Sequence, residues 1–341
     1  MSLPIIAKIS LVNLIENAKN IKNLLKNSSK FCAVVKSDGY GHGIVEVSNA
    51  IYSYVDAFAV SLVSECEALR IAGIDKPIMI LTPPFKESVY KLIKYDTIIP
   101  VSTFEEIKLV YESAKKLKRV AKIQIAINSG MNRLGFSTLK EIKTAVYYVK
   151  SFKNLNLVGA YSHFGDICNK EYTERQFKKF NKLIKPIKDV YPNVDYHISA
   201  SGGMLADEKY HLSMCRVGLL LYGYKPFITS KIQVKPVMEV LAKRIIVRNK
   251  LKGKNLLYGS NLSNVNTATI LRVGYADGFF REGLENSLNS LCMDLSGVSG
   301  KVDKEYLLIM QDAEILAKKW GTIPYEVLVN ATKRANRIYI K

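Results

Sequence analysis

Short apolar runs alternate with amphipathic segments along the first two thirds of the chain. The runs are rich in Val, Ile and Ala, which is typical of strands buried on both faces of a parallel sheet. The predicted strands span residues 32–36, 57–61, 77–81, 97–101, 122–127, 155–164, 196–201 and 215–222. Roughly eight strand–helix units predict a (β/α)8 barrel. A doubly wound open sheet is the alternative, because a sequence does not show whether the sheet closes.

Polar residues mark where several of the intervening helices begin. Thr103, followed three residues later by Glu106, forms a capping box, in which each residue satisfies a free backbone N–H of the other. Ser137 is expected to start the helix that runs to 149. The charged amphipathic segment 171–190 predicts one long helix before the seventh strand.

The pattern changes after Lys225 and Pro226. Segments 237–247, 267–273 and 337–340 favour strands, and one helical segment, 312–320, lies among them. The sequence therefore predicts a barrel over residues 1–225 and a smaller, mainly β domain over residues 226–341.

The composition of the 341 residues is that of a packed globular protein, with 48% hydrophobic and 23% charged residues. No apolar run is long enough to cross a membrane, and the first ten residues lack a basic leader and a cleavage site. We therefore expect a cytoplasmic protein without a membrane partner.

The formal charge of +20 raises the question of nucleic-acid binding. The lysines are scattered over amphipathic segments and form no basic block interleaved with aromatic residues, so nucleic acid is not an expected partner. The cysteines are odd in number, widely separated and never in a CxxC pair, which argues against both a disulfide framework and a metal site. They are Cys32, Cys66, Cys168, Cys215 and Cys292.

The most specialised stretch is 31–43, FCAVVKSDGYGHG. Its apolar run ends at Lys36, at the carboxyl end of a buried strand, where an α/β barrel places its chemistry. Apolar surroundings disfavour the ammonium form of a lysine and provide the neutral amine that Schiff-base chemistry requires. The alternative is a lysine that ends the strand and extends into solvent.

Further polar residues stand at the ends of later predicted strands. Arg133 follows the strand that ends at 127, His163 lies near the end of the next, and His197 and Arg216 lie in the last two. Each has a structural alternative, such as a surface ion pair or a hydrogen-bonded core histidine. Because strand ends in a barrel point towards a common centre, their joint position predicts an active site.

The stretch 31–43 closely resembles the pyridoxal-phosphate lysine motif of bacterial alanine racemases, and matching motifs follow in the same order along the whole chain. The resemblance implies that Lys36 carries the cofactor covalently and that Tyr40, Ser201 and the backbone of Gly218 bind its phosphate.

The strand-end residues also match motifs of that family. GMNRLGF contains Arg133, which by resemblance contacts the cofactor and the substrate, while His163 packs on the pyridine ring beside a network that includes His197. Arg216 matches the arginine facing the pyridine nitrogen. A guanidinium does not readily exchange a proton with that nitrogen, which favours simple proton exchange over transamination.

In the second domain, VGYADGFFR resembles the motif of the second catalytic base, which here is Tyr275. The resemblance implies that Lys36 serves the D face of the substrate and Tyr275 of the partner subunit the L face, in a homodimer with shared active sites. Met293 matches a substrate-carboxylate contact and Tyr325 a phosphate contact.

The chain departs from the family pattern at three places. Ala126 stands where many members carry a carbamylated lysine that orients Arg133, and Asn128 or a bound anion is the expected substitute. The stretch 281–291 is shorter than usual, which predicts a missing hairpin and a wider entrance. Pro324 replaces a common Asn and removes a backbone donor.

The resemblance implies an isomerase that interconverts L-alanine and D-alanine with pyridoxal 5'-phosphate and supplies D-alanine for peptidoglycan, without a metal. Two alternatives stay open. One is a racemase of the same family acting on serine or lysine, and the other is a pyridoxal-phosphate-binding barrel that acts in cofactor homeostasis.

Overall fold

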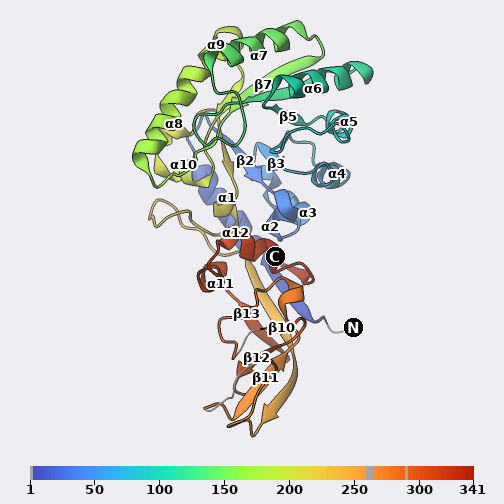
Figure 1. The fold of residues 1–341 in the computed structure, drawn as a ribbon, viewed down its shortest axis with the longest axis vertical. Coiled ribbons are helices and arrows are strands. Elements are labelled where there is room, and N and C mark those ends of the chain that lie inside the picture. The colour runs from blue at the N-terminus through green and yellow to red at the C-terminus, as the bar shows by residue number, and fades with distance from the viewer. Residues whose placement is uncertain (1–2, 259–263, 289–290) are drawn as a thin grey trace.

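The computed structural model describes residues 3–258, 264–288 and 291–341 as two adjoining bodies, a barrel and an elongated β-rich domain (Figure 1). The barrel sheet has eight strands, in the order β8-β7-β6-β5-β4-β3-β2-β9, and neighbours within this order are parallel. Its strands are β2 (Lys30–Val34), β3 (Ala57–Val60), β4 (Ile78–Ile80), β5 (Ile98–Val101), β6 (Ala121–Ala126), β7 (Leu155–Tyr161), β8 (Asp195–His197) and β9 (Met214–Val217).

The sheet nearly closes on itself between β8 and β9. The amide of Ser213 donates to the carbonyl of Tyr196 at 3.0 Å, and the amide of Arg216 donates to the carbonyl of Ser199 at 3.0 Å. The predicted barrel is thus confirmed over the open-sheet alternative. The strands are buried because helices cover the outer face and side chains fill the interior.

Helices follow the strands around the barrel (Figure 1). Thr103 caps α6 as predicted, accepting from the amide of Glu106 at 3.2 Å. The predicted cap at Ser137 is wrong by one residue, because Thr138 and Glu141 form the capping box of α7. The outer helices are α1 (Leu11–Leu24), α3 (Ile44–Ile51), α4 (Val63–Ile71), α5 (Val89–Lys94), α6 (Phe104–Lys116), α7 (Leu139–Ser151), α8 (Lys170–Leu183), α9 (Lys185–Val190) and α10 (Ser201–Ala206).

The helix predicted over 171–190 is two helices, α8 and α9, that meet at Ile184. Pro186 lies in the first turn of α9, where a backbone N–H has no partner within the helix, so the N–H that proline lacks is not needed there. An unbroken helix would have needed that N–H, so the proline explains the division.

The second sheet contains strands from both ends of the chain. Its order is β12-β11-β10-β1-β14, with β13 also paired to β10. The strands are β1 (Ile5–Ser10), β10 (Met238–Asn249), β11 (Thr267–Leu271), β12 (Ser296–Ser299), β13 (Tyr306–Met310) and β14 (Asn336–Ile340). The division of the chain at 225/226 stays a prediction, and the structure adds that the first strand belongs to the second sheet.

Helices α11 (Ala313–Trp320) and α12 (Pro324–Asn330) complete the second domain, and α12 lies between its sheet and the barrel (Figure 1). One continuous set of buried apolar residues runs through both bodies, including Leu221 of the barrel and Leu328 of α12. The two bodies therefore pack as one core. Among the helices of the described residues, none has the length and apolar character that a membrane crossing requires.

Candidate active site

The lysine at the end of β2 is followed by a turn of unusual hand. In α2 (Lys36–Tyr40) the φ angles of Ser37, Asp38, Gly39 and Tyr40 are 53°, 53°, 63° and 52°, so this turn is left-handed. The amide of Gly41 closes it by donating to the carbonyl of Ser37 at 2.9 Å. Each non-glycine residue in this conformation costs about 1–2 kcal/mol, so the surrounding structure must hold the turn in place.

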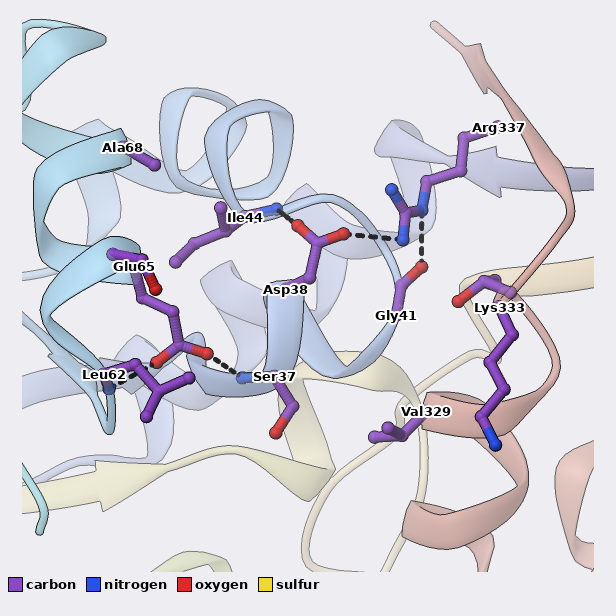
Figure 2. Close-up of a pocket in the computed structure, with 12 residues that line it drawn as sticks. Ser37, Asp38, Gly41, Ile44, Leu62, Glu65, Ala68, Val329, Lys333 and Arg337 are labelled. Carbon is purple, nitrogen blue, oxygen red and sulfur yellow. Dashed lines mark hydrogen bonds and ion pairs between the residues drawn. The ribbon is translucent and has the colours of Figure 1, made fainter. Parts of the chain in front are cut away.

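The environment of Lys36 favours its neutral amine. Partial burial lowers the pKa of Lys36, and the positive charge of Arg133 lowers it further, whereas Glu65 acts in the opposite direction. The carboxylate of Glu65 accepts from the backbone amide of Ser37, next to the lysine (Figure 2). Arg133 itself is exposed and lies near enough to act on Lys36 through its charge.

A buried guanidinium occupies the centre of the barrel site. Arg216 donates to Nδ1 of His197, to the carbonyl of Ser162 at 2.7 Å and to the carbonyl of Ile198 at 3.3 Å. It also faces Nδ1 of His163 at 3.3 Å. Because an arginine has no acceptor, both histidines accept through Nδ1. Four contacts from two strand ends fix the position of this side chain.

Both histidines beside Arg216 are held neutral. Burial, and then the charge of Arg216, lowers the pKa of His163 to about 3. The same two causes place the pKa of His197 well below its ordinary value. Arg216 therefore has two uncharged imidazoles as neighbours, with no carboxylate among its hydrogen-bond partners in the described part of the chain.

The residues expected at the phosphate lie together. A Cβ at Gly218 would stand 2.7 Å from Oη of Tyr40, so glycine keeps open the space beside that hydroxyl. The rings of Tyr40 and Tyr325 lie 5.6 Å apart, and Oγ of Ser201 accepts from the amide of Leu220 at 3.4 Å. Three hydroxyls and a small-residue cradle fit the phosphate of pyridoxal phosphate, and Lys36 fits its aldehyde.

Two of the three departures from the family pattern, Ala126 and Pro324, can be located in the structure, whereas the short stretch 281–291 includes residues 289 and 290, which lie outside the described residues. Ala126 is buried at the end of β6, and Asn128 binds Asn132 and Ser137 through its side-chain amide at 3.1 and 3.0 Å. No hydrogen bond between Asn128 and Arg133 is present among the described residues, so Asn128 does not replace the missing lysine. Pro324 occupies the first turn of α12, where a helix tolerates a missing N–H.

Residues Tyr275 and Met293 lie on the surface of the second domain, 42% and 56% exposed. Their backbones adjoin, because the amide of Ala276 donates to the carbonyl of Met293 at 3.0 Å. Within the described part of this chain, neither side chain has a hydrogen bond or ion pair to Lys36 or Arg216. One chain thus brings together the barrel residues and leaves Tyr275 and Met293 apart from them.

Sequence reasoning missed the residue that holds the Tyr275 turn. The carboxylate of Asp277 is buried, accepts from the amide of Gly274 at 2.8 Å and pairs with Arg272 at 3.1 Å and Arg334 at 3.3 Å. An aspartate two residues after a tyrosine resembles any turn residue in a sequence. The feature of the sequence that could have indicated a turn is the glycine that follows, Gly278. In the structure its φ of 98° shows the tight turn that a glycine permits.

A lysine at a barrel strand end, a buried arginine and clustered hydroxyls fit the class of lysine-based pyridoxal-phosphate enzymes. Family models agree in detail: residues 9–226 match "Alanine racemase, N-terminal domain" and residues 237–339 match "Alanine racemase, C-terminal domain". The chain belongs to the alanine racemase family, whose members are pyridoxal-phosphate-dependent isomerases acting as amino-acid racemases.

Individual relatives match over their full length. The chain is 34% identical to alanine racemase of Clostridium novyi (strain NT), covering 99% of this chain and 96% of that protein. It is 30% identical to alanine racemase of Methanococcus maripaludis, with both chains covered completely. The structure of alanine racemase from Clostridium difficile 630 superposes with a TM-score of 0.93 at 29% identity, covering 100% of this chain and 96% of that one.

Proposed function

We propose that this protein interconverts L-alanine and D-alanine, supplying D-alanine for peptidoglycan, with Lys36 and Tyr275 as the two proton-transferring residues. The observation that carries the proposal is the juxtaposition of a lysine of lowered pKa, Arg216 with two neutral histidines, and the Tyr40–Gly218 cradle at one end of the barrel. The full-length likeness to proteins named alanine racemase supports alanine as the substrate.

Each barrel residue has a distinct part in this proposal. Tyr40, Ser201, Tyr325 and the backbone of Gly218 would hold the phosphate, and Lys36 would hold the aldehyde carbon. When bound, pyridoxal phosphate acidifies the Cα–H of an amino acid by accepting electron density. Arg216 cannot readily give up a proton to the ring nitrogen, which limits that acceptance. The site residues are therefore suited to returning a proton to Cα rather than to moving an amino group.

Racemisation also requires a proton donor on the opposite face of Cα. We infer that Tyr275 of the partner subunit supplies it in a homodimer. We also infer that the backbone of Met293, a residue that is 56% exposed in one chain, contacts the substrate carboxylate there. The exposure of both side chains in one chain supports this arrangement, because each is available to a second copy. Arg133 would bind the substrate side of the cofactor. All five cysteines are free, which supports the proposed cytoplasmic location.

A racemase of serine or lysine is the alternative suggested by the short stretch 281–291, but the full-length relatives named alanine racemase do not favour it. A pyridoxal-phosphate-binding barrel without turnover is disfavoured, because residues 237–339 match the racemase C-terminal family model. Purified protein with added pyridoxal phosphate should convert L-alanine to D-alanine faster than it racemises L-serine or L-lysine. Activity on serine or lysine alone would contradict the substrate assignment.

Two variants test the assigned residues. Lys36→Ala should lose covalent cofactor attachment and activity, and Tyr275→Phe should keep attachment and lose at least about 100-fold in kcat. Lys143→Ala and Tyr147→Phe, both exposed on α7, are the matched controls and should behave as wild type. Full activity in Tyr275→Phe would remove the tyrosine from the mechanism.

A further inference from the structure

We propose that Arg337, on the last strand of the second domain, is a positioning residue for Lys36 and Tyr40, acting through the left-handed turn between them. The inference rests on the proposed function in one respect, namely that Lys36 and Tyr40 hold the cofactor. It adds that β14, the last strand of the second domain, holds the backbone turn that carries two of the cofactor residues in the same chain.

The guanidinium of Arg337 holds the turn at two points. Its Nε donates to the carbonyl of Gly41 at 2.7 Å, and its Nη2 lies 2.6 Å from Oδ2 of Asp38. The other carboxylate oxygen of Asp38 accepts from the amide of Ile44, the first residue of α3, at 2.8 Å (Figure 2). Arg337 and Asp38 therefore join β14, the turn and α3 through charge-assisted hydrogen bonds.

A second carboxylate holds the beginning of the turn. Oε1 of Glu65 accepts from the amide of Ser37, while Oε2 accepts from the amides of Ser61 and Leu62 at 2.8 and 2.9 Å. Glu65 thereby ties the turn to the start of α4 (Figure 2). Glu65 thus holds Ser37, the residue after Lys36. Arg337 holds Asp38, two residues before Tyr40, and Gly41, directly after it.

These polar contacts have a specific task because packing encloses only part of the turn: Gly39 and Tyr40 are buried, whereas Ser37 is exposed and Asp38 is half-buried. Ser37, Asp38, Glu65 and Arg337 line a pocket of about 490 Å³ between the barrel and the second domain. A left-handed run of Ser, Asp and Tyr is unfavourable for L-residues, so it persists only where neighbours determine it. On the pocket side, the side chains that hydrogen-bond to the turn are those of Glu65 and Arg337. On the buried side, Nδ1 of His42 lies 3.0 and 2.9 Å from the carbonyls of Gly39 and Tyr40.

The ring of Tyr40 is the part of the site most directly affected. It stacks on Tyr222 at 4.8 Å, and its hydroxyl points at the Gly218 cradle. A change in the backbone on either side of Tyr40 moves this hydroxyl, and a change at Ser37 moves Lys36. Loss of Arg337 should therefore weaken cofactor binding before it alters the rest of the fold.

The experiment measures cofactor binding directly. Apoprotein of Arg337→Met, Arg337→Lys and Asp38→Asn is titrated with pyridoxal phosphate, following the visible absorption of the lysine-bound cofactor and its dependence on pH. We expect the Kd to rise about tenfold or more in Arg337→Met and less in Arg337→Lys, whose ammonium reaches only one of the two acceptors. The double variant Arg337→Met/Asp38→Asn should bind no more weakly than Arg337→Met, because both changes break one ion pair.

Arg175→Met, which breaks an exposed ion pair with Glu171 on α8, is the control and should bind as wild type. Urea unfolding of each apoprotein distinguishes a loss of positioning from a loss of fold. If Arg337→Met does not fold, Asp38→Asn serves as the test variant, because its side chain keeps the oxygen that accepts from the amide of Ile44. Borohydride reduction and peptide mapping of wild type test the underlying function. Wild type without label at Lys36 overturns both proposals, whereas label at Lys36 with unchanged Kd in Arg337→Met and Asp38→Asn overturns this inference alone.

Discussion

Arg216 donates to Nδ1 of His197 inside the barrel, at the ends of two adjoining strands. Because Nδ1 accepts, the single proton of this neutral imidazole lies on Nε2. The same reasoning applies to His163, whose Nδ1 faces Nη2 of Arg216 at 3.3 Å. Arg216 is therefore a permanent cation flanked by two uncharged rings of defined tautomer.

The neutral histidines should make the fold sensitive to mild acid. Folding lowers the pKa of His163 from 6.5 to about 3 and that of His42 from 6.5 to about 4, chiefly through burial. The unfolded chain binds more protons below pH 6.5, so stability is complete above that value and is lost as pH falls towards the folded pKa. We expect the free energy of unfolding in urea to fall by on the order of 3 kcal/mol between pH 7.5 and 5.5. His163→Gln should reduce this difference, and a stability independent of pH over this range would contradict the assignment.

Cofactor attachment should respond in opposite ways to the two charges near Lys36. Glu65 raises the pKa of Lys36 and Arg133 lowers it. Glu65→Gln, which keeps an oxygen acceptor for Ser37, should shift the pH profile of attachment to lower pH, and Arg133→Gln should shift it to higher pH. The measurement is the rate of pyridoxal-phosphate attachment to apoprotein between pH 6 and 10. Shifts in the same direction would remove the electrostatic explanation.

A methyl group at Gly218 should disturb the phosphate cradle. The Cβ of Gly218→Ala would lie 2.7 Å from Oη and 3.1 Å from Cζ of Tyr40, a buried ring that cannot easily move. Overpacking of this kind costs about 1–3 kcal/mol, so the Kd for pyridoxal phosphate should rise roughly tenfold. Gly73→Ala is the control, because its Cβ meets nothing within 4 Å and only its φ of 83° opposes it. It should lose some stability and keep its affinity for the cofactor.

Shared active sites should allow two inactive variants to restore each other. A mixed dimer of Lys36→Ala and Tyr275→Phe contains one site with both residues intact and one with neither. After unfolding and joint refolding in equal amounts, about a quarter of wild-type activity should return, because half of the dimers are mixed and half of their sites are intact. Each variant refolded alone should stay inactive. No recovery on mixing would place both residues in one chain or remove one of them from the reaction.

The barrel could be predicted because its strands are short apolar runs and its helices carry caps at their boundaries. Lys36, Arg133 and Arg216 could be predicted from strand ends, and the structure brings their charges within reach of one another. The cap at Ser137 was wrong because Thr138, an equally good cap, follows it directly.

The remaining features depend on contacts distant in sequence. β1 was missed because six residues before a helix give a weak strand signal, and its partners β10 and β14 begin far along the chain. Arg337 and Asp38 are likewise separated by nearly the whole chain, so no local spacing connects them. The left-handed conformation of the turn after Lys36 could not be predicted from the sequence for a different reason. Ser and Asp are ordinary turn residues, and only long-range contacts make their left-handed conformation stable.

The position of β1 has a consequence for the order of synthesis. This strand is translated before the barrel, yet it pairs in parallel with β14, which contains residues 336–340 and is translated after the barrel. The whole barrel is translated between the two, so the second sheet cannot be completed until residues 336–340 have followed the barrel out of the ribosome. Because Arg337 is part of that final strand, a truncated product would lack both the closing edge of the sheet and the clamp on the turn after Lys36. The second sheet and the clamp on this turn are therefore completed only after the barrel has been translated.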